Sequence, residues 1–245
     1  MDLILDIGNT LAKMAVYSTD GVMLYRASVA VSELGKALDL LEETYPNIDW
    51  CMFSTVAKVN AKDLERLEER YKLLQLTSDL PVPFTNKYES RKTLGVDRIA
   101  LVSGAIQKYP NANVLVIDAG TCITYDFIDA TATYYGGAIS PGLTMRYKAM
   151  HTFTENLPLL ERVKEVSLIG TNTQDSMHSG VLLGMAYEVE GYINAYRKKF
   201  PDLITVLTGG DAQFLRDTIK NDIFANTNLL LEGLLNILNY NKDIS

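Results

Sequence analysis

Apolar and polar positions along the chain predict short strands and amphipathic helices that follow one another. The first residues predict strands over 3–5, 12–17 and 22–31, separated by turns. Helical spacing over 32–45 places Leu34, Leu38 and Leu41 on one face. Further strands are predicted at 50–55 and 71–76, and further helices at 60–71 and 97–109. This order of elements indicates the α/β class.

The pattern begins again at Val114. Residues 114–121 resemble residues 3–10, and the match pairs Asp6 with Asp118, Gly8 with Gly120, and Lys13 with Tyr125. An internal repeat of this length predicts two similar α/β halves, 1–112 and 113–245. No linker rich in Pro, Gly or Ser separates them, so we expect the halves to pack directly, with a nucleotide cleft between them.

The second half adds a predicted third strand at 134–139, an overlapping glycine-rich loop at 136–142, and then mainly helices. These helices are expected at 143–151, at 179–196, from Ala212 and at 229–238, with a strand at 204–207.

Two short motifs carry the candidate chemistry. In the segment 6–10, an acid ends an apolar strand and Gly8 permits a tight turn, so that backbone N–H groups can surround phosphate oxygens. The carboxylate of Asp6 can hold Mg²⁺. An ordinary Asx-type hairpin turn is the alternative for a single copy. The second copy at 118–121, and a third glycine cluster at Gly209–Gly210, favour nucleotide binding.

Other nucleotide-binding classes and other partners fit less well. The chain has neither a G-x-x-x-x-G-K-[ST] nor a G-x-G-x-x-G motif. Its formal net charge of −7 speaks against a nucleic-acid partner. No apolar run approaches the length of a membrane span, and the N-terminus lacks the basic region of a signal peptide. We therefore expect a cytoplasmic protein with no membrane partner.

The segment 94–98 offers a candidate acceptor site. Asp97 can serve as the base for an acceptor hydroxyl, and the planar guanidinium of Arg98 suits a carboxylate. The alternative is that Asp97 is the N-cap of the following helix, with Arg98 as the first helical residue.

The motifs taken together resemble those of the type III pantothenate kinases, within the actin-like ATPase and sugar-kinase superfamily. The resemblance covers nearly the whole chain, through the segments 6–10, 88–90, 94–98, 117–121, 136–142, 169–173, 207–211 and 231–234. It implies two ribonuclease-H-like halves. It also implies phosphorylation of pantothenate by ATP with Mg²⁺ and a monovalent cation, K⁺ or NH₄⁺, in a homodimer.

The resemblance also implies roles for individual residues. Asp97 would be the catalytic base, and Asp118 would ligate the monovalent cation. Pantothenate would contact Tyr88, Gly95, Val96, Asp97, Arg98 and Thr173. ATP would contact Asp6, Ile7, Gly8, Asn9, Thr10, Leu11, Ala12, Lys13 and Thr121, with Asp6 near Mg²⁺. One departure is Arg91, which stands where the family often has proline, and it leaves the shape of that loop open.

Two other functions share the phosphate hairpins. One is another small-molecule kinase or a phosphohydrolase of the same superfamily, which should lack the combination of Tyr88 with 95–98. The other is a non-catalytic, nucleotide-dependent sensor.

Overall fold

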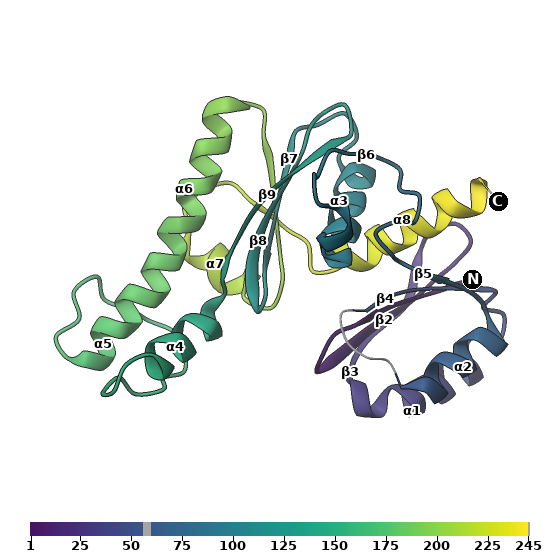
Figure 1. The fold of residues 1–245 in the computed structure, drawn as a ribbon, viewed down its shortest axis with the longest axis horizontal. Coiled ribbons are helices and arrows are strands. Elements are labelled where there is room, and N and C mark those ends of the chain that lie inside the picture. Colours follow the sequence, from purple (N-terminus) through teal and green to yellow (C-terminus); the bar gives the residue numbers. More distant parts are fainter. Residues whose placement is uncertain (56–59, 245) are drawn as a thin grey trace. The chain divides into compact units, whose positions relative to one another are not determined.

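The computed structural model describes residues 1–55 and 60–244. Its contacts divide the chain into two compact units (Figure 1). Unit 1 consists of Met1–Lys108 and Asn228–Ser245, and unit 2 is Tyr109–Thr227. The predicted halves, 1–112 and 113–245, differ from this division chiefly at the C-terminus, because the last helix belongs to unit 1.

Unit 1 is built on a mixed sheet with the strand order β3-β2-β1-β4-β5. The strands are β1 (Asp2–Ile7), β2 (Leu11–Tyr17), β3 (Met23–Ala30), β4 (Trp50–Thr55) and β5 (Lys72–Gln75). β1 to β3 pair antiparallel, whereas β4 pairs parallel with both β1 and β5. The centre of this sheet is therefore parallel, and such strands are usually covered on both faces.

Helices cover the two faces of this sheet. Helices α1 (Leu34–Thr44) and α2 (Ala61–Arg70) pack on one face, where Leu3, Leu5 and Ile7 join the core. Helices α3 (Val96–Lys108) and α8 (Leu229–Asp243) pack together, and α8 contacts β1 and β4. Two turns of 3₁₀-helix (Val31–Glu33 and Arg91–Thr93) and the short strand β6 (Thr85–Asn86) complete the unit.

Glycines hold α8 in unit 1. A Cβ at Gly233 would lie 1.8 Å from the carbonyl oxygen of Ala100, and one at Gly104 would lie 2.5 Å from that of Leu229. Only glycine lets the two helix backbones approach so closely. This contact explains why the last helix packs with the first unit although it follows the second along the chain.

Unit 2 repeats the topology of unit 1. Its strands are β7 (Val114–Ala119), β8 (Cys122–Ile128), β9 (Thr133–Pro141), β10 (Ile204–Thr208) and β11 (Phe224–Ala225). Their order, β11-β10-β7-β8-β9, matches that of unit 1 when β7 is equated with β1. The antiparallel and parallel pairings correspond as well. The prediction of two similar α/β halves is confirmed.

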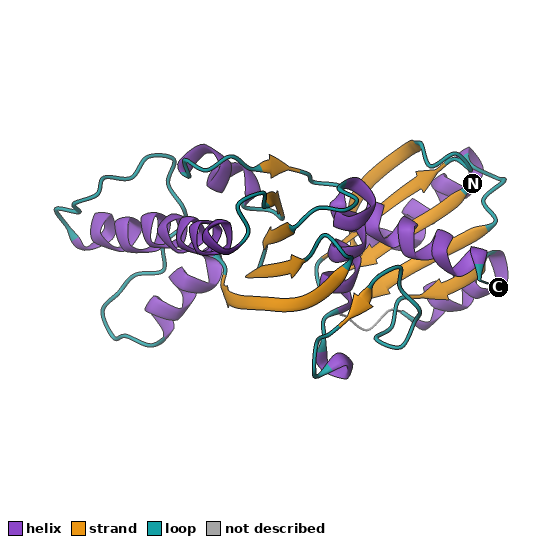
Figure 2. Ribbon diagram, turned by 90° about the horizontal axis from the view of Figure 1, so that it is seen from above, coloured by secondary structure: helices purple, strands orange, loops and turns teal. Residues whose placement is uncertain are grey.

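The helices of unit 2 are α4 (Leu143–Thr152), α5 (Thr173–His178), α6 (Gly184–Lys199) and α7 (Ala212–Thr218). A π-helical stretch, Ser179–Leu183, connects α5 to α6. Figure 2 distinguishes the helices, strands and loops of the chain by colour. The core forms where Leu115 and Ile117 of β7 meet Met185 and Val189 of α6.

Gly136 to Pro141 belong to β9, so the predicted strand at 134–139 is confirmed and the overlapping glycine-rich loop at 136–142 is wrong. A Cβ at Gly137 would lie 1.6 Å from the carbonyl oxygen of Tyr125 on the neighbouring strand. These glycines therefore serve close strand packing, which a sequence pattern cannot distinguish from a loop.

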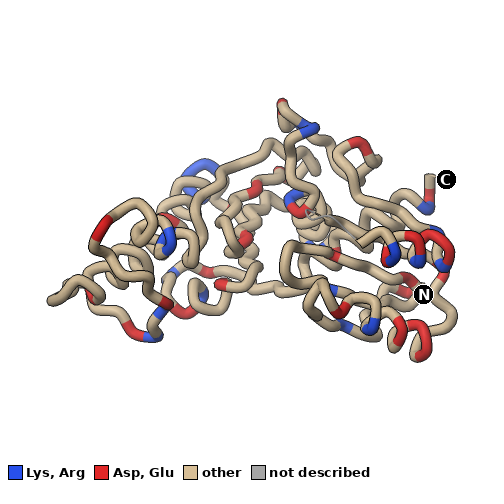
Figure 3. Tube along the Cα trace, turned by 60° about the horizontal axis from the view of Figure 1, so that its bottom comes forward, with Lys and Arg blue, Asp and Glu red and all other residues tan. Residues whose placement is uncertain are grey.

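Charged residues are mixed along the described chain, with Lys and Arg interspersed among Asp and Glu (Figure 3). Within residues 1–55 and 60–244, no helix is long and apolar enough to cross a membrane.

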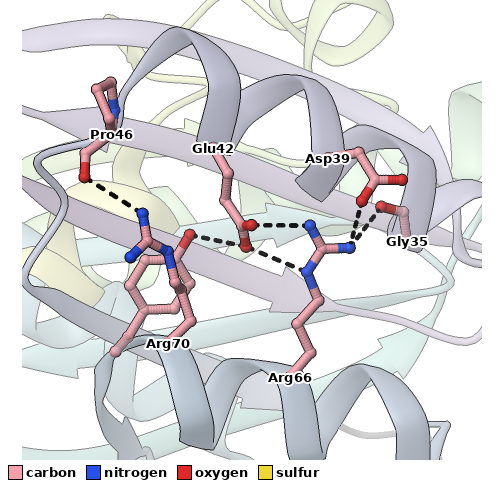
Figure 4. Close-up of polar contacts among 7 residues, drawn as sticks. Gly35, Asp39, Glu42, Pro46, Arg66 and Arg70 are labelled. Atoms are coloured by element: carbon pink, nitrogen blue, oxygen red, sulfur yellow. Dashed lines mark hydrogen bonds and ion pairs between the residues drawn. The ribbon is translucent and has the colours of Figure 1, made fainter.

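Arg66 joins α1 and α2, the two helices that pack on one face of the sheet of unit 1 (Figure 4). From α2, its Nε and Nη2 donate to the carboxylate of Glu42 on α1, at 3.1 and 2.9 Å. Its Nη1 lies 2.7 Å from Asp39 Oδ1 and donates to the Gly35 carbonyl at 3.2 Å. Arg70 on the same helix makes one longer hydrogen bond, 3.4 Å to the Pro46 carbonyl.

We expect Arg66→Ala to lower the free energy of unfolding by about 1–2 kcal/mol, because a forked, charge-assisted contact is lost from a partly exposed site. Arg70→Ala is the matched control and should cost less than about 0.5 kcal/mol. Urea unfolding followed by circular dichroism measures both. Equal losses in the two variants would contradict the role given to Arg66.

Candidate active site

The first phosphate hairpin joins β1 to β2 in unit 1. The N–H of Gly8 donates to the Leu11 carbonyl at 3.0 Å and closes the turn, while Asn9 and Thr10 are exposed at its tip. Register places Asp6 opposite Lys13, whose Nζ lies 3.7 Å from Asp6 Oδ2. The Ser54 hydroxyl at the end of β4 donates to Asp6 Oδ1 at 2.9 Å. The hairpin thus places two exposed residues, Asn9 and Thr10, at its tip and an oriented carboxylate at its base.

Asp97 lies close enough to Asp6 for its charge to affect the pKa of the Asp6 carboxyl. Burial raises the pKa of Asp6 above its ordinary value, Lys13 and the Ser54 hydroxyl lower it, and the charge of Asp97 raises it again. The carboxyl end of β1 and the start of α3 therefore bring two acids together in unit 1. These two residues are far apart in the sequence, but the fold brings them within range of an electrostatic interaction.

Asp97 lies inside the first turn of α3, which begins at Val96, so the alternative in which Asp97 is the N-cap is wrong. Its Oδ1 accepts a hydrogen bond from the N–H of Arg98 at 2.8 Å. A Cβ at Gly95 would lie 2.4 Å from the same oxygen. Glycine at 95 is therefore needed for the carboxylate to take this position.

Arg98, the next residue after Asp97, is buried and only 4% exposed. Its guanidinium carbon lies 5.4 Å from the centre of the Tyr88 ring, within the range of a cation–π contact. Tyr88, Gly95, Val96, Asp97 and Arg98 are thus brought together in unit 1, near Asp6.

Two hydrogen bonds hold the loop before α3 in place. Arg91 donates from Nη2 to the Asn86 carbonyl at 2.6 Å, and the N–H of Tyr88 donates to the Asn86 side chain at 2.9 Å. The side chain of Arg91 therefore closes this loop by a hydrogen bond.

The second hairpin, between β7 and β8, is one residue shorter than the first. Asp118 faces Thr124, whereas its counterpart Asp6 faces Lys13. The match of Lys13 with Tyr125 is therefore wrong, and Thr124 is the structural equivalent. The N–H of Gly120 donates to the Cys122 carbonyl at 3.0 Å, and Thr121 is exposed at the tip.

The third glycine cluster packs directly on this hairpin. Gly209 has a φ of +95°, and a Cβ on it would lie 2.4 Å from both Asp118 Oδ1 and the Ala119 carbonyl oxygen. The N–H of Asp211 donates to the same carbonyl at 2.9 Å. Gly210, by contrast, has open space where a Cβ would be. Gly209 admits the neighbouring backbone and the Asp118 carboxylate, and Gly210 leaves room for a ligand.

A pocket of about 680 Å³ lies beside these elements, within unit 2. Its volume falls in the range of small-molecule sites. Its lining residues are Gly120, Thr121, Thr144, Met145, Lys148, Ala149, Thr152, Phe153, Gly210 and Asp211. The pocket therefore connects Thr121 with the glycine cluster and with one face of α4.

The contribution of α4 to this pocket was not predicted from the sequence. Thr144, Lys148 and Thr152 recur every fourth residue and line the same wall. This spacing was the available signal, but it equally fits a solvent-exposed helix face.

Thr173 lies in unit 2, at the exposed start of α5, whereas the other predicted pantothenate residues belong to unit 1. Asn172 caps this helix by accepting from the N–H of Asp175 at 2.9 Å. A Cβ at Gly170 would lie 2.2 Å from the backbone nitrogen of Ser176, so glycine shapes the entry to α5.

Comparison with known proteins places the chain among relatives of the same length. A profile of the family described as Type III pantothenate kinase matches residues 2–195. The Type III pantothenate kinase of Flavobacterium johnsoniae is 44% identical over 243 residues, which are 99% of each chain. That of Christiangramia forsetii is 45% identical, with the same coverage.

The chain belongs to the type III pantothenate kinase family.

Solved structures with lower sequence identity support the fold of this family member. A Campylobacter jejuni structure described as a Baf family transcriptional activator aligns with a TM-score of 0.63 at 23% identity, covering 98% of this chain and 99% of that one. Component A of (R)-2-hydroxyglutaryl-CoA dehydratase from Acidaminococcus fermentans aligns at 0.56 and 16% identity, covering 100% and 99%. These structures share the predicted α/β fold of two similar halves.

In this kinase we expect Gly209→Ala to lower the free energy of unfolding by at least about 2 kcal/mol, since the new methyl group meets backbone atoms at a positive φ. Gly210→Ala should change it by less than about 0.5 kcal/mol, because its site is open. Thermal and urea unfolding of the paired variants tests this. A Gly209→Ala protein as stable as the Gly210→Ala protein would refute the packing described for Asp118.

Proposed function

We propose that this chain transfers the γ-phosphoryl group of ATP to the primary hydroxyl of pantothenate. The product, 4'-phosphopantothenate, is that of the first step of coenzyme A biosynthesis. The observation that carries the proposal is the convergence of Asp6, Asp97 and Arg98 in unit 1 of a chain related over its whole length to type III pantothenate kinases.

The acceptor site of the proposal is formed by the start of α3. The Asp97 carboxylate orients the hydroxyl for in-line attack and accepts its proton, since phosphoryl transfer depends chiefly on positioning and electrostatics. Arg98 binds the pantothenate carboxylate, and its low exposure strengthens such an ion pair. Tyr88 supports the guanidinium, Gly95 and Val96 line the site, and Thr173 contacts the substrate from α5.

The donor site uses both hairpins. The backbone of residues 6–13 contacts the ATP phosphates, and Thr121 contacts the nucleotide from unit 2. The pocket beside Thr121 and Gly210 has the size and openness to hold the nucleoside. Lys13, opposite Asp6 in the hairpin, contributes a positive charge on the phosphate side.

Kinases of this type act with a divalent metal ion, and Asp6 fits Mg²⁺. Among the described residues, no three acidic, His or Cys side chains group as a metal site. Mg²⁺ with ATP does not need such a group, because one or two carboxylates and the phosphates suffice. Burial, and to a lesser extent the charge of Asp97, raise the pKa of Asp6, and a cation bound beside this carboxylate would favour its charged form. When bound, Mg²⁺ neutralises charge on the phosphates.

The monovalent cation of the proposal, K⁺ or NH₄⁺, lies at Asp118. This carboxylate is held against the Gly209 backbone at the end of β7, where carbonyl oxygens are also close. Replacing K⁺ by Na⁺ at constant ionic strength should depress turnover. Equal rates in both salts would remove Asp118 from this role.

A homodimer is also part of the proposal. Unit 2 exposes large apolar side chains near Thr173, with Leu168 68% and Ile169 77% exposed, and Tyr187 on α6 is 57% exposed. A second copy would cover such a surface. Sedimentation equilibrium tests this, and a monomeric mass at micromolar concentration would refute it.

We propose a cytoplasmic enzyme, acting without nucleic-acid or membrane partners.

The experiment that tests the function is a coupled ADP-release assay with Mg-ATP and K⁺, with and without pantothenate. ADP release that requires pantothenate supports the proposal. ADP release without it would indicate a phosphohydrolase, release with other hydroxyl acceptors another kinase, and nucleotide binding without release a sensor.

We expect Asp97→Asn to lower kcat by about 10²–10⁴-fold, the usual contribution of a general base, while ATP binding persists. Asp63→Asn is the matched control, because Asp63 occupies the first turn of α2 and plays no part in the proposed site. It should retain wild-type turnover. Steady-state kinetics measure both, and a near-normal kcat for Asp97→Asn would eliminate this residue as the base.

A further inference from the structure

Glu188 of α6 is bonded to three other elements of unit 2. Its Oε1 accepts hydrogen bonds from the Tyr125 hydroxyl on β8, at 2.9 Å, and from the Ser140 hydroxyl on β9. Its Oε2 pairs with Nη2 of Arg146 on α4. The Glu188 and Arg146 side chains are only 26% and 19% exposed. An ionic contact shielded to this degree constrains geometry more than a surface pair does.

The charge on Glu188 is maintained by its partners. Burial alone would raise the pKa of Glu188, but the hydrogen bonds from Arg146, Ser140 and Tyr125 outweigh it and lower the pKa below its ordinary value. Glu188 is therefore ionised at neutral pH, and the contact with Arg146 joins two full charges.

The partners of Glu188 surround the corner at which β9 turns into α4. Arg146 also donates from Nε to the Pro141 carbonyl at 2.8 Å. On the other side of this corner, the N–H of Gly142 donates to the Thr121 carbonyl at 3.0 Å. A Cβ at Gly142 would lie 2.2 Å from the Gly120 carbonyl oxygen. The corner thus lies between the Glu188 carboxylate and the tip of the second hairpin.

This corner joins two walls of the pocket assigned to the nucleoside. Gly120 and Thr121 form one wall, and α4 forms another through Thr144 and Lys148. The spacing between the walls depends on the direction in which α4 leaves β9. Figure 1 shows α4 and α6 in unit 2, where the Glu188–Arg146 contact joins them.

We propose that Glu188 is a positioning residue for the nucleotide: through Arg146 and Ser140 it holds α4 at the angle that keeps the nucleoside pocket open to ATP. Glu188 and Arg146 do not line this pocket and act through the corner at Pro141–Gly142. The inference rests on the proposed function, because it assigns the nucleoside to this pocket.

The test compares Glu188→Gln and Arg146→Met with Glu190→Gln. Glu190 lies on the same helix and accepts from the Lys220 N–H at 2.8 Å, so its substitution removes an equal charge without touching α4. Glu188→Gln and Arg146→Met should each raise KM for ATP by about tenfold, while kcat stays within about threefold. This is the result expected when ground-state and transition-state binding are lost equally. KM for pantothenate should stay within about threefold, and Glu190→Gln should behave as wild type.

The double variant, Glu188→Gln with Arg146→Met, should raise KM for ATP no more than the larger single effect, because the two residues act as one contact. All kinetics are measured at a temperature at which circular dichroism shows each variant folded. A lower melting temperature with an unchanged KM for ATP would show a purely structural role and overturn the inference.

Calorimetric titration with ADP separates this inference from the proposed function. Weaker ADP binding by Glu188→Gln and Arg146→Met than by Glu190→Gln supports the positioning role, whatever the acceptor substrate proves to be. Absence of pantothenate-dependent ADP release in the wild type would refute the proposed function alone. Equal ADP affinity in all variants would refute the positioning role alone.

Discussion

Burial of β1 and β7, each an interior strand of its sheet, is the constraint on which the site depends. Each strand has a parallel neighbour on one side and an antiparallel hairpin on the other. Leu3, Leu5, Leu115 and Ile117 are fully buried. After this apolar run, Asp6 and Asp118 stand at equivalent positions near the carboxyl ends of the two strands. Chemistry therefore gathers at this edge, as it commonly does in α/β sheets.

The two hairpins have diverged within this shared frame. Removing one residue from the second turn replaces the ion pair of Asp6 and Lys13 by the pairing of Asp118 with Thr124. The carboxylate of Asp118 instead lies against the Gly209 backbone. Since side chains alternate between faces along a strand, a difference of one residue changes which groups surround an otherwise equivalent acid. The duplicated fold thereby provides two acids in different electrostatic environments.

Glycines set the closest approaches in both units. Gly95 makes room for the Asp97 carboxylate, Gly233 lets α8 contact α3, and Gly142 brings the β9–α4 corner against the second hairpin. Glu188 and Arg146 then hold that corner from the opposite side. Backbone contact thus determines how near the parts of the site lie, and ionic contacts determine at what angle they are held.

Much of the fold follows from local pattern. Alternating apolar residues predicted β1 and β2, the spacing of Leu34, Leu38 and Leu41 predicted α1, and the second D-x-G pattern predicted the repeat, because side-chain periodicity is a local property of strands and helices.

The family resemblance likewise rested on short motifs such as 94–98, and the comparisons confirm it. Other features depend on residues far apart in the chain. The packing of α8 with unit 1, the proximity of Asp6 to Asp97 and the Glu188–Arg146 contact were all decided by tertiary structure. The physical reason is that a glycine or a charge has no single local meaning: its role depends on which distant backbone or opposite charge the fold brings to it.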